Sequence, residues 1–164
     1  MQTIDMKWLE PDVKGCREIA AALTEVELAE LGTALLRTCR MSCCSVPPPV
    51  LAVELIGATP RSWGDAHRAF SDVRDATLQF DQAQTPGSDP TYQLLFVAEN
   101  TAKVIYNATN PIGPFDASSG MHLLISVAHF VRVRGVPELR TTIASLVEEA
   151  LARATTRKER TYES

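Results

Sequence analysis

Residues 63–80 read WGDAHRAFSDVRDATLQF, and the spacing of their apolar side chains decides the fold class. Apolar or small residues recur at alternating intervals of three and four: Trp63, Ala66, Phe70, Val73, Thr77 and Phe80. Such a heptad-like seam is typical of an amphipathic helix. The polar residues fall on the opposite face, as a solvated face requires: Asp65, Arg68, Asp72, Asp75 and Gln79. We therefore predict one long helix over about residues 60–84.

The segments on both sides of this stretch also carry helical patterns, with start and stop signals. The capping box Thr24-x-x-Glu27 precedes a stripe of leucines, which predicts a helix over residues 25–43. Asp89 followed by proline fits a helix N-terminus, and residues 90–108 are apolar nearly all round, as in the central helix of a bundle. Further helices are predicted over residues 11–23, over 120–134 with Gly135 as terminator, and from 137 onward. The sequence thus predicts an all-α, single-domain bundle of five or six helices, with those over 60–84, 90–108 and 120–134 at its core.

Three segments are less regular. Val46-Pro47-Pro48-Pro49 predicts an extended, polyproline-like connector, because proline fixes φ and removes a backbone donor. Residues 50–56 form a short apolar run that fits a helix or a strand, and residues 131–134 leave the same choice. Residues 153–164 carry almost no apolar side chain. We therefore expect the helical domain to cover residues 1–152 and the rest to form a flexible tail.

The charge and hydrophobicity of the chain limit the classes of function. Its 164 residues are 45% hydrophobic and carry a net charge of −4, as in a globular protein long enough to bury a core. Negative charge disfavours general nucleic-acid binding and favours a basic protein partner. The first residues lack the apolar run of a secretory signal, and the longest apolar stretch, residues 121–133, is too short to cross a membrane. We therefore expect a cytoplasmic protein with reduced cysteines and no membrane contact.

Three of the four cysteines are close together in the sequence, at Cys39, Cys43 and Cys44. Their spacing lacks the paired Cys-x-x-Cys arrangement of structural zinc sites. Cys39 instead continues the leucine stripe of the helix over residues 25–43, and cysteine is small and readily buried. Core packing is therefore the interpretation, and the sequence predicts neither a metal nor a cofactor.

A polar, turn-rich stretch, NATNPIGPFDASSG at residues 107–120, separates two strongly apolar segments and predicts a long loop. Polar side chains from this loop and the helices beside it are candidates for lining a pocket: Glu99, Asn100, Lys103, Tyr106, Asn107, Asp116 and His122. His122 is the candidate acid–base group, because a nearby Asp116 carboxylate would hold its imidazolium form. The competing interpretation is that this polar stripe is the solvent-facing edge of an otherwise buried helix.

The sequence contains no nucleophile elbow, no phosphate-binding Gly-Lys-Ser/Thr loop and no His-Glu-x-x-His motif, which favours a non-enzymatic role. Our first hypothesis is an interaction protein, such as an immunity- or antitoxin-like inhibitor of a basic enzyme. It would contact its partner through the 107–120 loop or through Asp65, Asp72 and Asp75. The alternative is a small-ligand-binding protein or enzyme with a pocket beside that loop. A homodimer that pairs the seam of residues 60–84 between two copies is compatible with either hypothesis.

Overall fold

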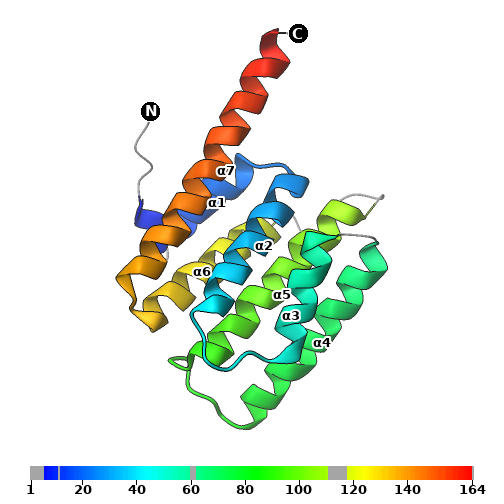
Figure 1. Ribbon diagram of the computed structural model, residues 1–164, viewed down its shortest axis with the longest axis vertical. Coiled ribbons are helices and arrows are strands. Elements are labelled where there is room, and N and C mark those ends of the chain that lie inside the picture. The colour runs from blue at the N-terminus through cyan, green and yellow to red at the C-terminus, as the bar shows by residue number, and fades with distance from the viewer. Residues whose placement is uncertain (1–5, 11, 60–61, 111–117, 164) are drawn as a thin grey trace.

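The computed structural model describes residues 6–10, 12–59, 62–110 and 118–163 (Figure 1), and every regular element in these ranges is helical. The elements are the 3₁₀ turn η1 (Met6–Leu9) and the helices α1 (Val13–Ala21), α2 (Glu25–Met41), α3 (Pro48–Ala58), α4 (Trp63–Gln82), α5 (Pro90–Thr109), α6 (Ser119–Arg134) and α7 (Pro137–Glu163). The all-α prediction is confirmed, but these residues contain seven α-helices rather than five or six. Among them, no helix combines the length and the apolar character needed to span a membrane.

The start and stop signals in the sequence act as predicted. The Glu27 backbone N–H donates to Thr24 Oγ1 at 3.1 Å and the Thr24 N–H donates to Glu27 Oε1 at 2.8 Å, which completes the capping box of α2. At the start of α5, Asp89 accepts a hydrogen bond from the backbone N–H of Tyr92 at 3.1 Å. Gly135 ends α6 in the left-handed conformation, with φ of 63°. Local capping chemistry therefore explains where these helices begin and end.

The helix missing from the sequence prediction is α3, and its prolines explain why. Pro48 and Pro49 occupy the first turn of α3, where backbone N–H groups have no partner within the helix, so proline costs no hydrogen bond there. Pro47, the residue before them, is the N-cap and is extended. The expected polyproline-like connector is therefore largely a helix start. The apolar run that follows is helical, as are residues 131–134 at the end of α6.

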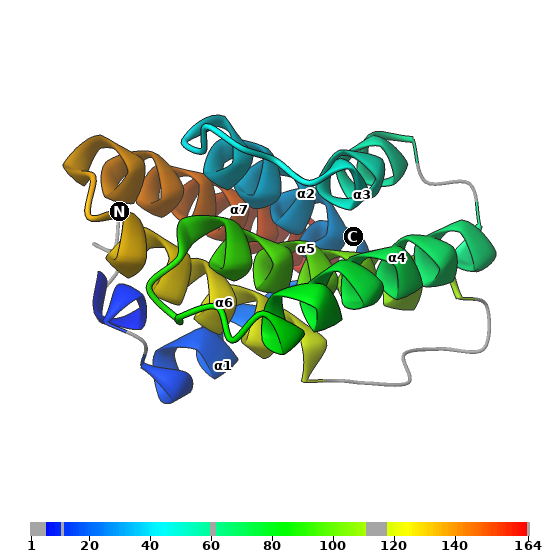
Figure 2. The ribbon, with the colours of Figure 1, turned by 90° about the horizontal axis from the view of Figure 1, so that it is seen from below.

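The centre of the bundle is α5, as its all-round apolar character predicts. It is flanked by α4 and α6 and covered by α2 and α3 (Figures 1 and 2). The middle of the α4 seam is buried within the chain at Ala66, Val73 and Thr77, whereas Trp63 at its start is 48% exposed. Because α4 packs against α5 and α3, those three residues are not available to pair two copies of the chain.

The predicted 107–120 loop is shorter than expected at both ends. Asn107 and Thr109 belong to the last turn of α5, and Ser119 and Gly120 begin α6. Gly120 packs so closely on α2 that an added Cβ would lie 2.9 Å from a methyl carbon of Leu28. Residues 111–117 lie outside the described residues. Helices α5 and α6 therefore extend into the polar stretch from both ends, with Asn110 and Ser118 as the capping residues.

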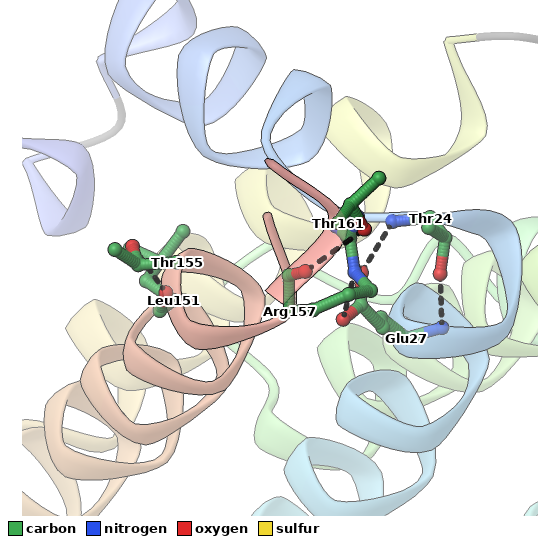
Figure 3. Close-up of polar contacts among 6 residues, drawn as sticks. All are labelled: Thr24, Glu27, Leu151, Thr155, Arg157 and Thr161. Carbon is green, nitrogen blue, oxygen red and sulfur yellow. Dashed lines mark hydrogen bonds and ion pairs between the residues drawn. The ribbon is translucent and has the colours of Figure 1, made fainter. Parts of the chain in front are cut away.

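Helix α7 continues to Glu163, through the residues that we expected to form a flexible tail, and its end projects beyond the rest of the bundle (Figure 1). Ala154 is buried, and two hydrogen bonds link Arg157 to the start of α2 (Figure 3). Arg157 Nε and Nη2 donate to the two carboxylate oxygens of Glu27 at 3.0 and 2.9 Å. The hydrogen bond from Arg157 is the main cause that lowers the pKa of Glu27 to about 2. One carboxylate thus completes the capping box of α2 and ties down the end of α7.

Replacing Arg157 with alanine is expected to loosen the end of α7 and to make the stability of the fold less sensitive to acid. Because the folded state lowers the pKa of Glu27, this carboxylate stabilises the fold above its ordinary pKa of 4.5, and the contribution is lost as the pH falls toward about 2. Without Arg157, stability should fall less over this pH range. Amide protons of residues 153–163 should exchange roughly two- to fivefold faster, as measured by hydrogen–deuterium exchange.

The matched control for this experiment is Arg153→Ala, which removes an exposed arginine from the same helix. Arg153 makes no ion pair or side-chain hydrogen bond with the residues that the structure describes. Its replacement should leave both the exchange rates and the acid profile unchanged. Equal effects of the two substitutions would contradict a specific role for the Arg157–Glu27 pair.

Candidate functional site

Several predicted pocket residues lie along one edge of the interface between α4 and α5, in a row of polar and aromatic contacts that we call the α4–α5 ladder. Its members are Trp63, His67, Phe70, Arg74, Phe80 and Asp81 from α4, and Tyr92, Phe96, Glu99, Lys103 and Tyr106 from α5. At one end the rings of Phe80 and Tyr92 stack with centroids 5.9 Å apart. At the other end Tyr106 lies edge-on to Trp63, with centroids 6.1 Å apart. The ladder therefore joins the two helices along their length.

Three of the predicted site residues are members of this ladder, and each has a partner on α4. Glu99 accepts from Arg74 Nη1 at 3.4 Å, and Lys103 Nζ lies 5.6 Å from the ring centroid of Phe70. Tyr106 contacts both Trp63 and His67. Because these groups interact with one another, they support the interpretation of the polar stripe as the edge of a buried helix.

The other predicted pocket residues lie apart from the ladder. The Asn100 side chain donates to the backbone oxygen of Phe96 at 3.0 Å, within its own helix, and Asn107 is buried. His122 is exposed on α6, with its Nδ1 3.4 Å from Ser118 Oγ. Asp116 lies outside the described residues, so the proposed pairing of Asp116 with His122 stays a prediction.

The predicted partner surface lies on α4. Asp72 and Asp75 are exposed, whereas Asp65 is half-buried in the first turn, where its backbone N–H donates to Ser62 Oγ at 3.2 Å. Asp65 and Asp72 are four and three residues from Ala69, which is buried. Helix α4 packs against α3 as well as α5. Asp65 and Asp72 lie on the same side of α4 as Ala69, whereas Asp75, six residues from Ala69, does not.

The sequence reasoning missed the outward surface of α3. Val50 and Val53 point into the core, whereas Leu51 is 47% exposed and Leu55 is 68% exposed. Pro48 and Ala58 are exposed on the same side, so within α3 this surface has no polar side chain, and the exposed Thr59 follows it at the C-cap. We call these four residues, Pro48, Leu51, Leu55 and Ala58, the α3 apolar face. The available signal was the run PPVLAVELIGA, which has a single polar residue, Glu54, too few for the solvent side of a surface helix.

The only charged residue of α3 is Glu54, and it points inward. This side chain is 9% exposed and is held by two arginines of α2. Arg37 Nε donates to Oε1 at 3.0 Å, while Arg40 donates through Nε to Oε2 at 2.9 Å and through Nη2 to Oε1 at 2.6 Å. Hydrogen bonding from these arginines, above all from Arg40, lowers the pKa of the Glu54 carboxyl. The charge on α3 thus fixes the helix against α2 and leaves its outward side apolar.

Of the clustered cysteines, only Cys39 packs in the core as the sequence predicts. Cys39 is completely buried in the core, and burial raises the pKa of its thiol. Cys43 is half-buried and Cys44 is exposed. Among the described residues, no group of three histidine, cysteine or acidic side chains is placed to hold a metal ion.

A surface pocket of about 290 Å³ lies between η1, α1 and α7. Its lining residues are Lys7, Trp8, Asp12, Gly15, Glu18, Ile19 and Leu151. None of them is a predicted site residue. This pocket therefore gives no support to the pocket expected beside the 107–120 loop.

The fold and these surfaces define an all-helical bundle with an apolar face on α3, which lies between Arg37 of α2 and the helix α4, whose exposed polar face carries Asp72. Comparison with protein-family models, with curated proteins and with solved structures finds no match to this chain. The case for a function therefore depends on the exposed surfaces of the bundle.

Proposed function

We propose that this protein acts by protein–protein interaction and that the α3 apolar face is its docking surface. The observation that carries the proposal is the exposure of Leu51 and Leu55 side by side on a helix without any outward polar group. Single exposed leucines are common on proteins, but a contiguous apolar patch bordered by charge marks an interaction site. A protein partner would cover these leucines and remove them from water.

The charge around this surface favours a basic partner. Asp72 and Asp75 are exposed on α4, and the whole chain carries a net charge of −4. Complementary charge speeds association and selects among partners. The class that we propose is a cytoplasmic, immunity- or antitoxin-like inhibitor of a basic protein, acting without catalysis of its own.

The test is capture of a basic protein from native lysate, compared among variants of the immobilised chain. Leu55→Asp should reduce capture about tenfold or more, because a buried anchor residue carries much of the binding energy, while the melting temperature stays unchanged. Replacing Asp72 and Asp75 with lysine should weaken capture and also reduce its dependence on salt. Capture alone does not support the proposal without this dependence on the variants.

The matched control is Leu78→Asp on α4. Leu78 is 48% exposed, as much as Leu51, but it lies outside the α3 apolar face. Its replacement should leave capture unchanged. Capture that ignores Leu55→Asp and the charge reversal would contradict the proposal. A metabolite that raises the melting temperature equally in the parent and in Leu55→Asp would favour the alternative, a small-ligand-binding protein.

A further inference from the structure

We infer that the α3 apolar face binds an amphipathic helix of the partner. A carboxylate of this partner helix would pair with Arg37, and its basic edge would face α4. This inference rests on the proposed function and specifies the chemistry of the partner. It follows from three features of the surface: the spacing of the apolar side chains, the state of Arg37, and the position of the acidic residues of α4.

The apolar side chains have the spacing of a helix-packing surface. Pro48, Leu51, Leu55 and Ala58 are separated by three, four and three residues, and the stripe is roughly 15 Å long. A stripe of this kind packs against a similar stripe on a second helix of three or four turns. Helix α3 lies between α2 and α4 (Figures 1 and 2), so a helix docked along it would have one neighbour on each side.

Arg37, on the α2 side, is oriented but only partly used. Its Nε is held by Glu54 at 3.0 Å, while the side chain is 52% exposed. The two terminal amino groups form no hydrogen bond with the residues that the structure describes. A guanidinium that is fixed at Nε offers those two groups to a carboxylate as a paired donor. Arg37 thus predicts an acidic residue on the edge of the partner helix that faces α2.

The α4 side has the opposite charge. Asp72 is exposed on α4, Asp65 lies two turns before it on the same face, and the exposed Arg68 lies between them, so this face has a net negative charge. A partner helix would therefore carry lysine or arginine on the edge that faces α4. The two edges together select a helix with a bipolar charge pattern, because a helix with two basic edges would place a cation against Arg37.

The experiment uses three synthetic peptides of about 18 residues, long enough to form a helix in water. All three have leucines at alternating intervals of three and four. The bipolar peptide has lysines on one edge and a central glutamate among neutral residues on the other; the basic and acidic peptides carry a single sign on both edges. Binding to the full chain is measured by fluorescence anisotropy. We expect the bipolar peptide to bind with a Kd on the order of 10–100 µM, and the other two about fivefold or more weaker.

Variants of the chain identify the contacts. Leu55→Asp should weaken the bipolar peptide at least about tenfold, whereas Leu78→Asp should not change its binding. Arg37→Gln should weaken the bipolar peptide about fivefold. Changing the peptide glutamate to glutamine should weaken binding to the parent chain by the same factor. It should have little further effect on binding to Arg37→Gln, because in a double-mutant cycle the second change costs nothing once its partner is gone. Circular dichroism checks that each variant is folded.

Two results would overturn the inference. If all peptides bind equally, or none binds, while Leu55→Asp still abolishes capture of a protein partner, the proposed function stands and the bipolar helix is wrong. If light scattering shows a dimer of the chain that Leu55→Asp dissociates, the face belongs to a second copy of this protein. Binding that requires Leu55 and couples Arg37 to the peptide glutamate supports the inference.

Discussion

Gly57→Ala should destabilise this protein more than any other single-methyl addition to α3, by about 2–3 kcal/mol. Gly57 lies where α3 crosses α2, and a Cβ added there would lie 2.7 Å from Thr33 Cγ2 and 2.9 Å from Thr33 Cβ. Thr33 is buried and its hydroxyl donates to the Ala29 carbonyl at 2.8 Å, so it cannot turn away without losing that bond. The helices must therefore separate. For a chain of this size the melting temperature should fall by roughly 5–10 °C, as measured by circular dichroism.

The control for this substitution is Gly64→Ala in the first turn of α4. Among the residues that the structure describes, an added Cβ there meets only Ser62 Oγ, at 3.7 Å, which is an ordinary contact. Alanine has the higher helix propensity, so this variant should be unchanged or up to about 1 kcal/mol more stable. Adding Thr33→Ala to Gly57→Ala should recover part of the loss, because it removes the hydroxyl and the methyl group that collide. Equal stability of Gly57→Ala and the parent would show that α2 and α3 are not packed as closely as described.

Glu54→Ala should have the next largest effect, a loss of about 2 kcal/mol. Removing one partner of a buried ion pair costs more than this, but both arginines here are partly exposed and water screens them. The parent should also be sensitive to acid. The folded state lowers the pKa of Glu54, so its contribution is present above the ordinary pKa of 4.5 and is lost as the pH falls below it. In Glu54→Ala that part of the acid-dependent loss should be absent, which urea unfolding at pH 7 and pH 3 would measure.

Glu30→Ala on α2 is the matched control for Glu54→Ala. Glu30 is exposed and forms no ion pair with the residues that the structure describes. Its removal should change the free energy of unfolding by no more than about 0.5 kcal/mol at either pH. If Glu54→Ala behaves like Glu30→Ala, the link from Glu54 to Arg37 and Arg40 does not stabilise the fold.

These two predictions concern the same structural feature, the attachment of α3. A close backbone approach at Gly57 and a carboxylate shared by two arginines at Glu54 both hold α3 against α2. A docking surface on a rigidly held helix loses little conformational freedom when a partner binds. The attachment of α3 therefore supports the proposal that its outward face is an interaction surface.

Much of the fold follows from local sequence. The seam of α4, the capping box at Thr24, the N-cap at Asp89 and the terminator Gly135 all act within one or two turns of their own position, so the sequence alone predicts them. The extension of α7 was missed because its contacts, such as the hydrogen bonds from Arg157 to Glu27, 130 residues away, are not visible in the local sequence. The same applies to the pocket residues, whose partners on α4 the sequence does not reveal.

The sequence by itself determined the helical class, most of the helix boundaries and the acidic charge, because periodicity, capping and composition are properties of neighbouring residues. Only the tertiary structure decided that α3 is a helix lying at the surface, that Leu51 and Leu55 face outward, and that Glu54 faces inward. It also showed that α3 lies so close to α2 at Gly57 that an added Cβ would overlap the Thr33 side chain. These properties depend on which side chains other segments of the chain cover, and packing between distant segments determines that.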